Sequence, residues 1–448
     1  MRKFIRTVKN IIAIEDLRTK ILVTLGFILI YRFGAHVVIP GVDPGAIKEF
    51  QKEASEGGLI ALINMFSGGA FANASVFALG IMPYISASIV IQLLGMVVPY
   101  FQRLQREGES GRKKISQITR YLTVLITVVQ APAYLTNLRY QLPQEAFVMQ
   151  SKDLFWFSSI VIMVAGTMFI MWLGEKITDK GIGNGISLLI MIGIIARLPQ
   201  AFAAEFLAKM GTDGGGPIMF IVEMIILFLI FVASIALVQA VRRIPVQYAK
   251  RIVGNKQYGG ARQYLPLKLN AAGVMPIIFA QALMFLPMML TRFNSETANA
   301  FAAHFADITG FWYNFVYGVL IVVFTYFYTA ITVNPNQMAE DMKKNGGFIP
   351  GIKPGRRTAE YIDEIMSRIT FPGSLFLALV AILPAFAMLA GVNNQFAYFY
   401  GGTSLLILVG VVLDTLQQIE SHLLMRHYDG LTKSGRISGR AGTAQISM

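Results

Sequence analysis

The sequence predicts an all-α polytopic membrane protein with ten transmembrane helices in two five-helix halves. Three observations carry this prediction. Of the 448 residues, 55% are hydrophobic and only 14% are charged, whereas soluble domains contain about 25% charged residues. Apolar runs of about 20 residues, the length that a helix needs to cross a bilayer, recur along the chain. The Lys and Arg residues gather in alternate connections between these runs.

The first 20 residues are basic and carry apolar residues at helical spacing, among them Phe4, Val8 and Ile12. This pattern predicts an amphipathic segment on the membrane surface. The apolar run that follows reaches Arg32 without a small-residue cleavage site, so we expect it to persist as the first span. The chain contains no cysteine, which excludes disulfides and thiolate chemistry.

Hydropathy predicts ten spans. They cover residues 21–39, 75–100, 115–138, 154–174, 186–206, 217–240, 271–290, 311–333, 371–391 and 403–424. An even number of spans puts both termini on one side of the membrane. Of the 39 Lys and Arg residues, 31 fall on that side, and the positive-inside rule makes it cytoplasmic. This asymmetry also accounts for most of the net charge of +14.

The stretch 59–100 contains an apolar run that is too short to span, followed at once by a full-length one. Gly68-Gly69 interrupts the first run, while Pro83 lies inside the second and Pro99 at its end. Glycine is costly inside a helix and favours a break. Non-helical backbone at membrane depth is tolerated only inside protein or beside a wet cavity. The stretch therefore fits either a half-helix in the mouth of a pore or an interfacial hairpin without a function.

The Gly-rich segment 211–217 divides the spans into five and five. The predicted parts of the chain are 1–20, 21–210, 211–424 and a tail, 425–448. Because each half has an odd number of spans, equivalent halves would form an inverted repeat about an axis in the membrane plane. This expectation rests on topology, since the residues themselves show no repeat.

Two cytoplasmic connections, 241–270 and 334–370, are much longer than ordinary loops. The first carries seven Lys or Arg residues and no Asp or Glu, and the second is rich in Pro and Gly around residues 345–355. Connections this long are usually functional or disordered. Basic loops favour contact with anionic lipids or RNA phosphates. Positive-inside anchoring is the alternative explanation of the charges.

The sequence lacks a catalytic constellation: its four histidines are scattered, and no HExxH motif is present. The Gly-rich run 181–185 follows a membrane helix rather than a strand, so we interpret it as a tight turn. A small-solute carrier or an intramembrane enzyme would need ionisable groups within the membrane. The candidates, Arg32, Glu223 and Asp414, fit packing or snorkelling better than a relay. Isoleucines one helical turn apart could instead line an apolar constriction, although most such residues face lipid or other helices.

Six motifs spread along nearly the whole chain resemble the bacterial SecY family, the channel subunit of the secretory translocon. They are NMFSGG…FALGIMPYISASI (64–89), EGESGRKKISQ (107–117), MWLGEKITDKGIGNGIS (171–187), LPLKLNAAGVMP (265–276), GGFIPGIKPG (346–355) and GGTSLLI (401–407). The resemblance implies a channel that passes unfolded secretory chains across the cytoplasmic membrane and releases membrane-protein helices sideways into lipid. It implies no enzymatic activity and no cofactor.

The resemblance also implies site residues. A plug over 59–73 would include Leu62, Ile63, Met65, Phe66, Ser67, Gly68 and Gly69. An apolar pore ring would consist of Ile81, Ile85, Ile186, Ile190, Ile278 and Ile407. A lateral gate between spans 2, 3, 7 and 8 would include Pro83, Ser86, Ser88, Gln92, Asn270 and Pro276.

The two long loops would bind partners through basic residues. These are Arg242, Arg243, Lys250, Arg251, Lys256, Arg262, Lys268, Lys353, Arg356 and Arg357. The implied partners are the companion subunits SecE and SecG, the motor ATPase SecA, the ribosome, signal sequences with their nascent chains, and anionic lipids. The family usually has Arg at the position of Lys353, and Lys lacks the planar fork of Arg. A charge contact is therefore expected there, rather than a bidentate one.

Overall fold

The computed structural model describes residues 14–47, 64–148, 151–211, 216–248, 251–253, 256–258, 262–289 and 308–434. Its helices up to residue 210 are α2 (Glu15–Gly34), α5 (Met82–Val97), α6 (Pro99–Arg106), α7 (Glu109–Gln141), α8 (Lys152–Lys180) and α9 (Gly185–Met210), with a 3₁₀ turn at Gln144–Ala146. The later ones are α10 (Gly216–Gln239), α11 (Met275–Met289), α13 (Phe311–Thr332), α14 (Pro335–Lys344), α15 (Arg356–Leu389), α16 (Asn394–Ala397) and α17 (Gly402–Ser434).

The all-α class is confirmed within this part of the chain. Seven described helices are long and apolar enough to cross a membrane, and the pair α5–α6, bent by 100°, would be an eighth. The other two expected spans, 21–39 and 271–290, overlap α2 and α11; α2 begins at Glu15, inside the expected surface segment, and ends at Gly34. Helix α17 continues through residues 425–434, which the sequence assigned to the tail. Residues 1–13 of the expected amphipathic segment and 435–448 of the tail lie outside the described residues.

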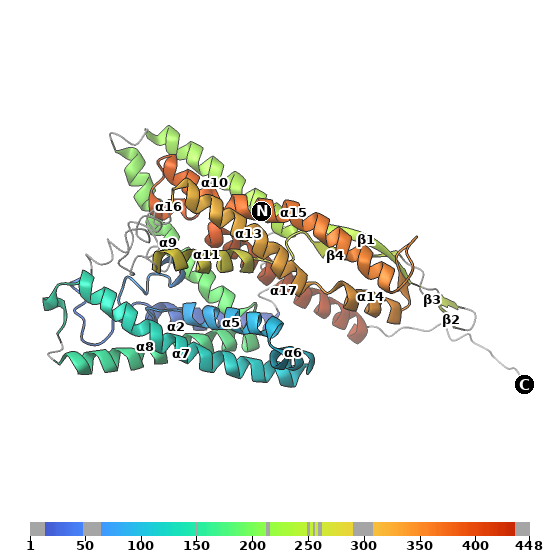
Figure 1. The fold of residues 1–448 in the computed structure, drawn as a ribbon, viewed down its shortest axis with the longest axis horizontal. Helices are drawn as coiled ribbons and strands as arrows, with labels where there is room; N and C mark the ends of the chain where they lie inside the picture. The colour runs from blue at the N-terminus through green and yellow to red at the C-terminus, as the bar shows by residue number, and fades with distance from the viewer. Residues whose placement is uncertain are drawn as a thin grey trace, which may run out of the picture.

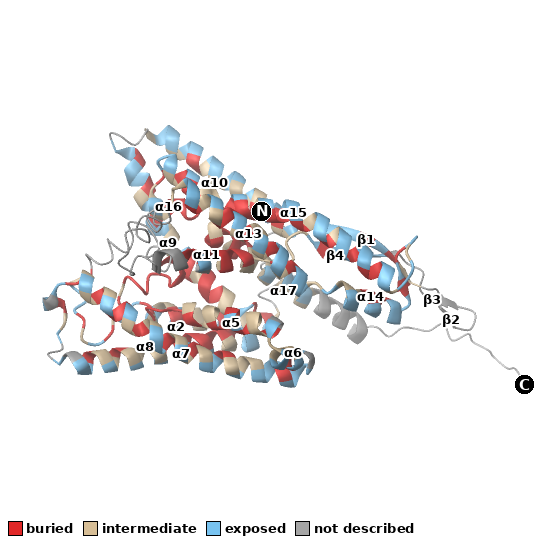
Figure 2. Cartoon of the chain, viewed as in Figure 1, coloured by how far each residue is buried: buried red, intermediate tan, exposed pale blue. Residues whose placement is uncertain are grey.

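The helices gather into two groups. In Figure 1, α2, α5, α7 and α8 lie together on one side, and α10, α13 and α15 lie on the other. Helix α9 connects the two groups, since it packs against α8 and also against α10 and α17. In Figure 2, α10 is mostly exposed or intermediate, and its exposed side chains, such as Ile225 and Phe228, are apolar except for Gln239 at its end. Such a face suits contact with acyl chains.

Helix α5 begins later than the expected span from residue 75. Ser75 forms an isolated β-bridge with Val38, residues 76–81 form turns, Gly80 has a φ of +56°, and the helix starts at Met82. Pro83 therefore lies in the first turn of the helix, where its missing N–H costs nothing, and not inside the span. The helix ends where Val98 turns extended, just before Pro99 begins α6.

The long connections 241–270 and 334–370 contain strands and helix, which we did not predict from the sequence. Strands β1 (Val241–Tyr248), β4 (Arg262–Lys268) and β5 (Gly347–Phe348) form an antiparallel sheet in the order β4-β1-β5. The short strands β2 (Arg251–Val253) and β3 (Lys256–Tyr258) form a separate pair.

Side-chain burial alternates along β1, which explains why this segment forms a strand with one face packed on the protein. Ile244 and Val246 of β1 are buried together with Leu267 of β4 and Ile362 of α15, whereas Arg243 and Pro245 of β1 are exposed. This is the period-two pattern of a half-buried strand. The sheet thus packs on the part of α15 that precedes the expected span 371–391.

Three charged side chains are buried together where α9 meets α10. The Lys209 Nζ atom lies 2.9 Å from a Glu223 carboxylate oxygen and 3.6 Å from one of Glu205. It also donates to the carbonyl of Gly391 at 2.9 Å, and the Asn393 N–H donates to Glu205 at 2.7 Å. All three charged residues are at most 6% exposed. The cluster therefore joins α9, α10 and the turn after α15.

Removing the single cation of this cluster should destabilise the protein strongly. Lys209→Met would leave two buried carboxylates without a countercharge, which costs about 3–5 kcal/mol. We expect a clear decrease in the Tm of the purified protein in detergent. Lys113→Met is the control, because it removes an exposed pair with the same i, i+4 spacing, worth under about 1 kcal/mol. Equal decreases for the two variants would contradict this account.

Candidate functional site

A cavity of about 410 Å³ lies between the two groups of helices. Five isoleucines line it: Ile85 of α5, Ile186 and Ile190 of α9, Ile278 of α11 and Ile407 of α17. The motifs that carry these residues are up to 322 positions apart in sequence, so only the fold brings them together. The result is an apolar girdle to which both halves of the chain contribute.

Ile81, the remaining isoleucine of the expected ring, lies next to this cavity. It is the residue just before α5 and is 5% exposed. It belongs to the same buried apolar cluster as Ile190 and Ile407, and this cluster also contains Met65 and Phe66 of the expected plug. The apolar wall of the cavity is therefore continuous with the expected plug.

The residues expected at the lateral gate fall into two groups. Ser88 and Gln92 of α5 line the cavity, and the Tyr328 hydroxyl of α13 donates to the Gln92 side-chain oxygen at 3.2 Å. This hydrogen bond joins the two halves. The other expected residues are Pro83 and Pro276, both buried in the first turns of α5 and α11, and the half-buried Ser86 and Asn270.

The expected plug is a series of turns over most of its described length, rather than a half-helix. Residues 64–66 are helical, residues 67–74 form turns, and Leu62 and Ile63 lie outside the described residues. Backbone groups of this segment are bonded internally and to its neighbours. The Ser67 hydroxyl accepts from the Phe71 N–H, and the Asn64 side chain accepts from the Ala72 N–H. Irregular backbone buried in this way meets the requirement for segments at membrane depth.

Two arginines from different helices hold this segment. The Arg32 guanidinium of α2 donates to the Gly68 carbonyl at 2.8 Å, and the Arg197 guanidinium of α9 donates to the Asn64 side-chain oxygen at 3.0 Å. The Tyr134 hydroxyl of α7 donates to the Phe71 carbonyl at 2.9 Å. From the sequence we interpreted Arg32 as a packing or snorkelling residue, and we did not single out Arg197. No local pattern links Arg197 to Asn64, which lies 133 residues away.

Gly68 and Gly69 are glycines because the backbone approaches its neighbours closely here. Both have positive φ angles, +65° and +92°. A Cβ atom on Gly68 would lie 2.8 Å from the Cα atom of Gly193 in α9, and one on Gly69 would lie 2.7 Å from the Arg197 guanidinium. The positive φ disfavours a side chain at both positions, and at Gly68 the contact with the Gly193 backbone excludes one as well.

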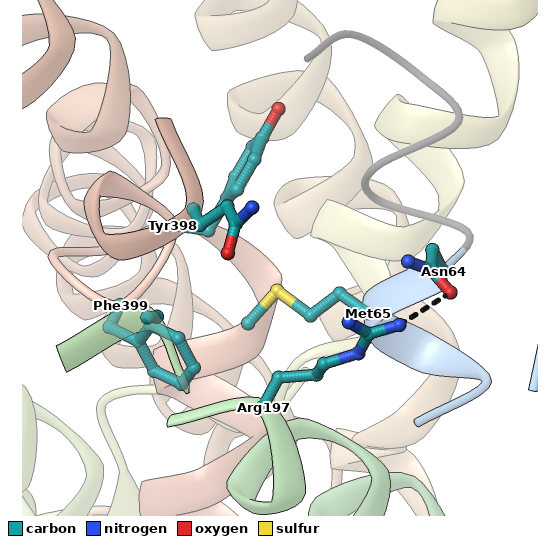
Figure 3. Close-up of a pocket in the computed structure, with 7 residues that line it drawn as sticks. Asn64, Met65, Arg197, Tyr398 and Phe399 are labelled. Carbon is teal, nitrogen blue, oxygen red and sulfur yellow. Dashed lines mark hydrogen bonds between the residues drawn. The ribbon is translucent and has the colours of Figure 1, made fainter. Parts of the chain in front are cut away.

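A small pocket of about 30 Å³ separates this segment from the other half of the chain. Figure 3 shows Met65 and Arg197 facing Tyr398 and Phe399, which follow α16, together with the bond from Arg197 to Asn64. A volume of this size holds about one water molecule. Burial raises the pKa of the Tyr398 hydroxyl.

The basic residues of the long connections lie mostly at the surface. Arg242 and Arg243 of β1 and Lys268 of β4 are exposed, as are Lys353, Arg356 and Arg357 around the start of α15. Arg251, Lys256 and Arg262 lie on β2, β3 and β4, and Lys250 is outside the described residues. Their role in binding partners stays a prediction.

Known proteins match this chain in the family that its sequence motifs indicate. The SecY family model matches residues 75–416. Two curated relatives are the protein translocase subunits SecY of Streptomyces scabiei, 47% identical, and Corynebacterium glutamicum, 44% identical; each alignment covers 93% of this chain and at least 97% of the relative.

The chain belongs to the SecY family.

Solved structures agree on the fold. A structure described as a protein-conducting channel superposes with a TM-score of 0.61 at 18% identity, covering 94% of both chains. Sec61 in a canine ribosome–channel complex gives a TM-score of 0.58 at 16% identity, again covering 94% of both chains. The SecY-family fold therefore accounts for the described arrangement of helices. Within the described residues, no group of three His, Asp or Glu side chains is placed to hold a metal ion.

A side chain at position 68 should loosen the packing of residues 64–74, the expected plug segment. Met65 is only 6% exposed, and the chain has no cysteine of its own, so Met65→Cys gives a single thiol probe. A left-handed conformation costs a non-glycine residue about 1–2 kcal/mol, to which the contact with Gly193 adds. We expect Gly68→Ala to accelerate maleimide labelling of Met65→Cys in detergent about tenfold.

Gly26→Ala is the matched control, because a Cβ atom at this position in α2 would meet nothing within 4 Å. It should leave the labelling rate unchanged. Equal labelling rates in Gly68→Ala and Gly26→Ala would contradict the close packing of Gly68 against α9.

Proposed function

We propose that this chain is the pore-forming subunit of a protein translocase, a channel that conducts unfolded secretory polypeptides and releases membrane-protein helices into lipid. The observation that carries the proposal is the convergence of five family-motif isoleucines on one cavity, with the sixth, Ile81, in the buried apolar cluster that joins most of them to Met65 and Phe66. Membership of the SecY family and the shared fold with a protein-conducting channel support it.

The isoleucines would act as the constriction of the channel. An apolar ring excludes ions because a narrow hydrophobic passage dewets, and an ion cannot cross it without its hydration water. Such a ring forms no strong bonds to a passing object, so it can widen around a polypeptide and close again. In the resting state, the described part of the expected plug, residues 64–73, would close this ring from one side.

The lateral gate would open between α5 and α7 of one half and α11 and α13 of the other. The described polar link across this boundary is the hydrogen bond from Tyr328 to Gln92, and a bond of this kind contributes only about 0.5–1.5 kcal/mol. A signal sequence is an apolar helix that prefers lipid to water. It would shift the gate toward the open state by its greater affinity for that state.

The orientation follows from charge. The positive-inside rule puts both termini and the sheet β4-β1-β5 on the cytoplasmic side of a bacterial cytoplasmic membrane. The exposed Arg242, Arg243, Arg356 and Arg357 would there meet ribosomal RNA, the SecA motor or anionic lipids. Sec61, a structural neighbour, is part of a ribosome–channel complex. SecE and SecG would be the companion subunits, and the ribosome or SecA would supply the work.

A small-solute carrier is the main alternative. Its best candidate for an ionisable site is the cluster of Glu205, Lys209 and Glu223, but these residues pair with one another and do not line the cavity. The wall of the cavity is predominantly apolar, which suits a passage more than a solute-binding site.

The most direct test of the constriction is resting ion conductance in planar bilayers. Replacing Ile85, Ile186 and Ile190 by Asn would wet the ring and should raise resting conductance by about tenfold or more, because each 1.4 kcal/mol removed from a barrier is worth a factor of about ten.

Val90→Asn and Ile195→Asn are the controls. They put the same amide on α5 and α9, at exposed positions that do not line the cavity, and should leave conductance low. Unchanged conductance in the ring variant, with the protein inserted and folded, would refute the assignment of the constriction.

A further inference from the structure

One face of α17 continues from the constriction toward the cytoplasmic end of the cavity. Ile407, Gly410, Val411 and Asp414 all line the cavity, and their spacing of i, i+3, i+4 and i+7 puts them on a single helix face. Asp414 lies two turns beyond Ile407, a rise of about 10 Å along the helix. Among the described residues that line the cavity, Asp414 is the only charged one.

The surroundings of Asp414 leave its charge available. The residue is exposed, and its carboxylate accepts one hydrogen bond, from the Gln418 amide at 3.3 Å. None of the ion pairs found in the described part of the chain involves Asp414. The neighbouring polar lining residues, Asn184 and Ser187 of the α9 N-terminus, are neutral. This end of the cavity therefore carries a single negative charge next to an apolar wall.

We propose that Asp414 binds the Lys or Arg residues that flank the apolar segment of an incoming polypeptide. An apolar helix against Ile407 and Val411 would bring residues one or two turns before it level with the carboxylate. The site would thus select for a cationic flank next to an apolar stretch, on the same side of the membrane as the positive loops. This inference rests on the proposed channel function and adds a specificity-determining residue to it.

A structural role for Asp414 makes a different prediction. Gln418, its hydrogen-bond partner, also accepts from the Gly183 N–H at 2.9 Å, so Asp414 could act by positioning the turn before α9. Loss of that role would impair every substrate to the same extent. Recognition of a cationic flank instead makes the effect depend on the charge of the substrate.

The test uses the full translocase in inverted membrane vesicles with three secretory reporters that differ only in the flank before the apolar segment: two Lys, two Gln or two Glu. For Asp414→Asn, we expect the initial rate to fall roughly fivefold for the Lys reporter and to change little for the Gln reporter, as suits one charge pair in a solvated site. Asp414→Lys should raise the rate of the Glu reporter above that of the wild-type chain. Both effects should shrink in high salt.

Glu420→Gln and Glu420→Lys are the matched controls, because Glu420 is an exposed acid on the same helix that does not line the cavity. They should leave the order of the three rates unchanged. Equal losses for all three reporters in Asp414→Asn, or no rescue of the Glu reporter in Asp414→Lys, would overturn the inference while leaving the channel function intact. Failure of the wild-type chain to pass even the Gln reporter would contradict the channel function, and the inference with it.

Discussion

The close contact between the Gly68-Gly69 backbone and α9 determines where residues 64–74, the expected plug segment, lie. It needs two residues without a Cβ atom on one side and Gly193 on the other, and it brings the Gly68 carbonyl and the Asn64 side chain within reach of two guanidiniums. Polar backbone groups cannot stay unpaired at membrane depth, so these bonds are a condition for an irregular segment there. The apolar side chains Met65 and Phe66 can then pack against the isoleucines.

The contacts of the plug segment are unequal between the two halves. Its hydrogen bonds go to α2, α7 and α9, all in the first half, while Tyr398 and Phe399 of the second half only border the small pocket beside it. The polar links between the halves are also unequal. The buried Glu205–Lys209–Glu223 cluster ties α9 to α10, whereas α5 and α13 share the hydrogen bond of Tyr328. If the channel opens as we propose, separation at α5 and α13 would break fewer of these polar links, and residues 64–74 would stay bonded to α2, α7 and α9.

Composition and hydropathy were enough to predict an all-α membrane protein, because a spanning helix must be apolar along its whole length. Motifs were enough to select the isoleucines, but their meeting at one cavity depends on helix packing between distant segments. The predicted start of the second span, residue 75, was wrong. A proline such as Pro83 fits the first turn of a helix as well as a break within one, so its position alone does not show where the helix begins. Glu205 went unnoticed, although its i, i+4 spacing to Lys209 was visible. Its pairing with Glu223 and the bond from Arg197 to Asn64 join separate segments, which no local pattern encodes.

The central claim is that a polypeptide passes between the isoleucines of the two halves. Photo-crosslinking probes at Ile81 and Ile278, one in each half, test it against a secretory chain that is stalled during translocation. Ile225 of α10, which is 55% exposed on the outer face, serves as the reference position. Adducts to the stalled chain from positions 81 and 278, and none from 225, are the predicted result. Adducts from 225 alone would show that the chain travels along the outside of the bundle and would contradict the account.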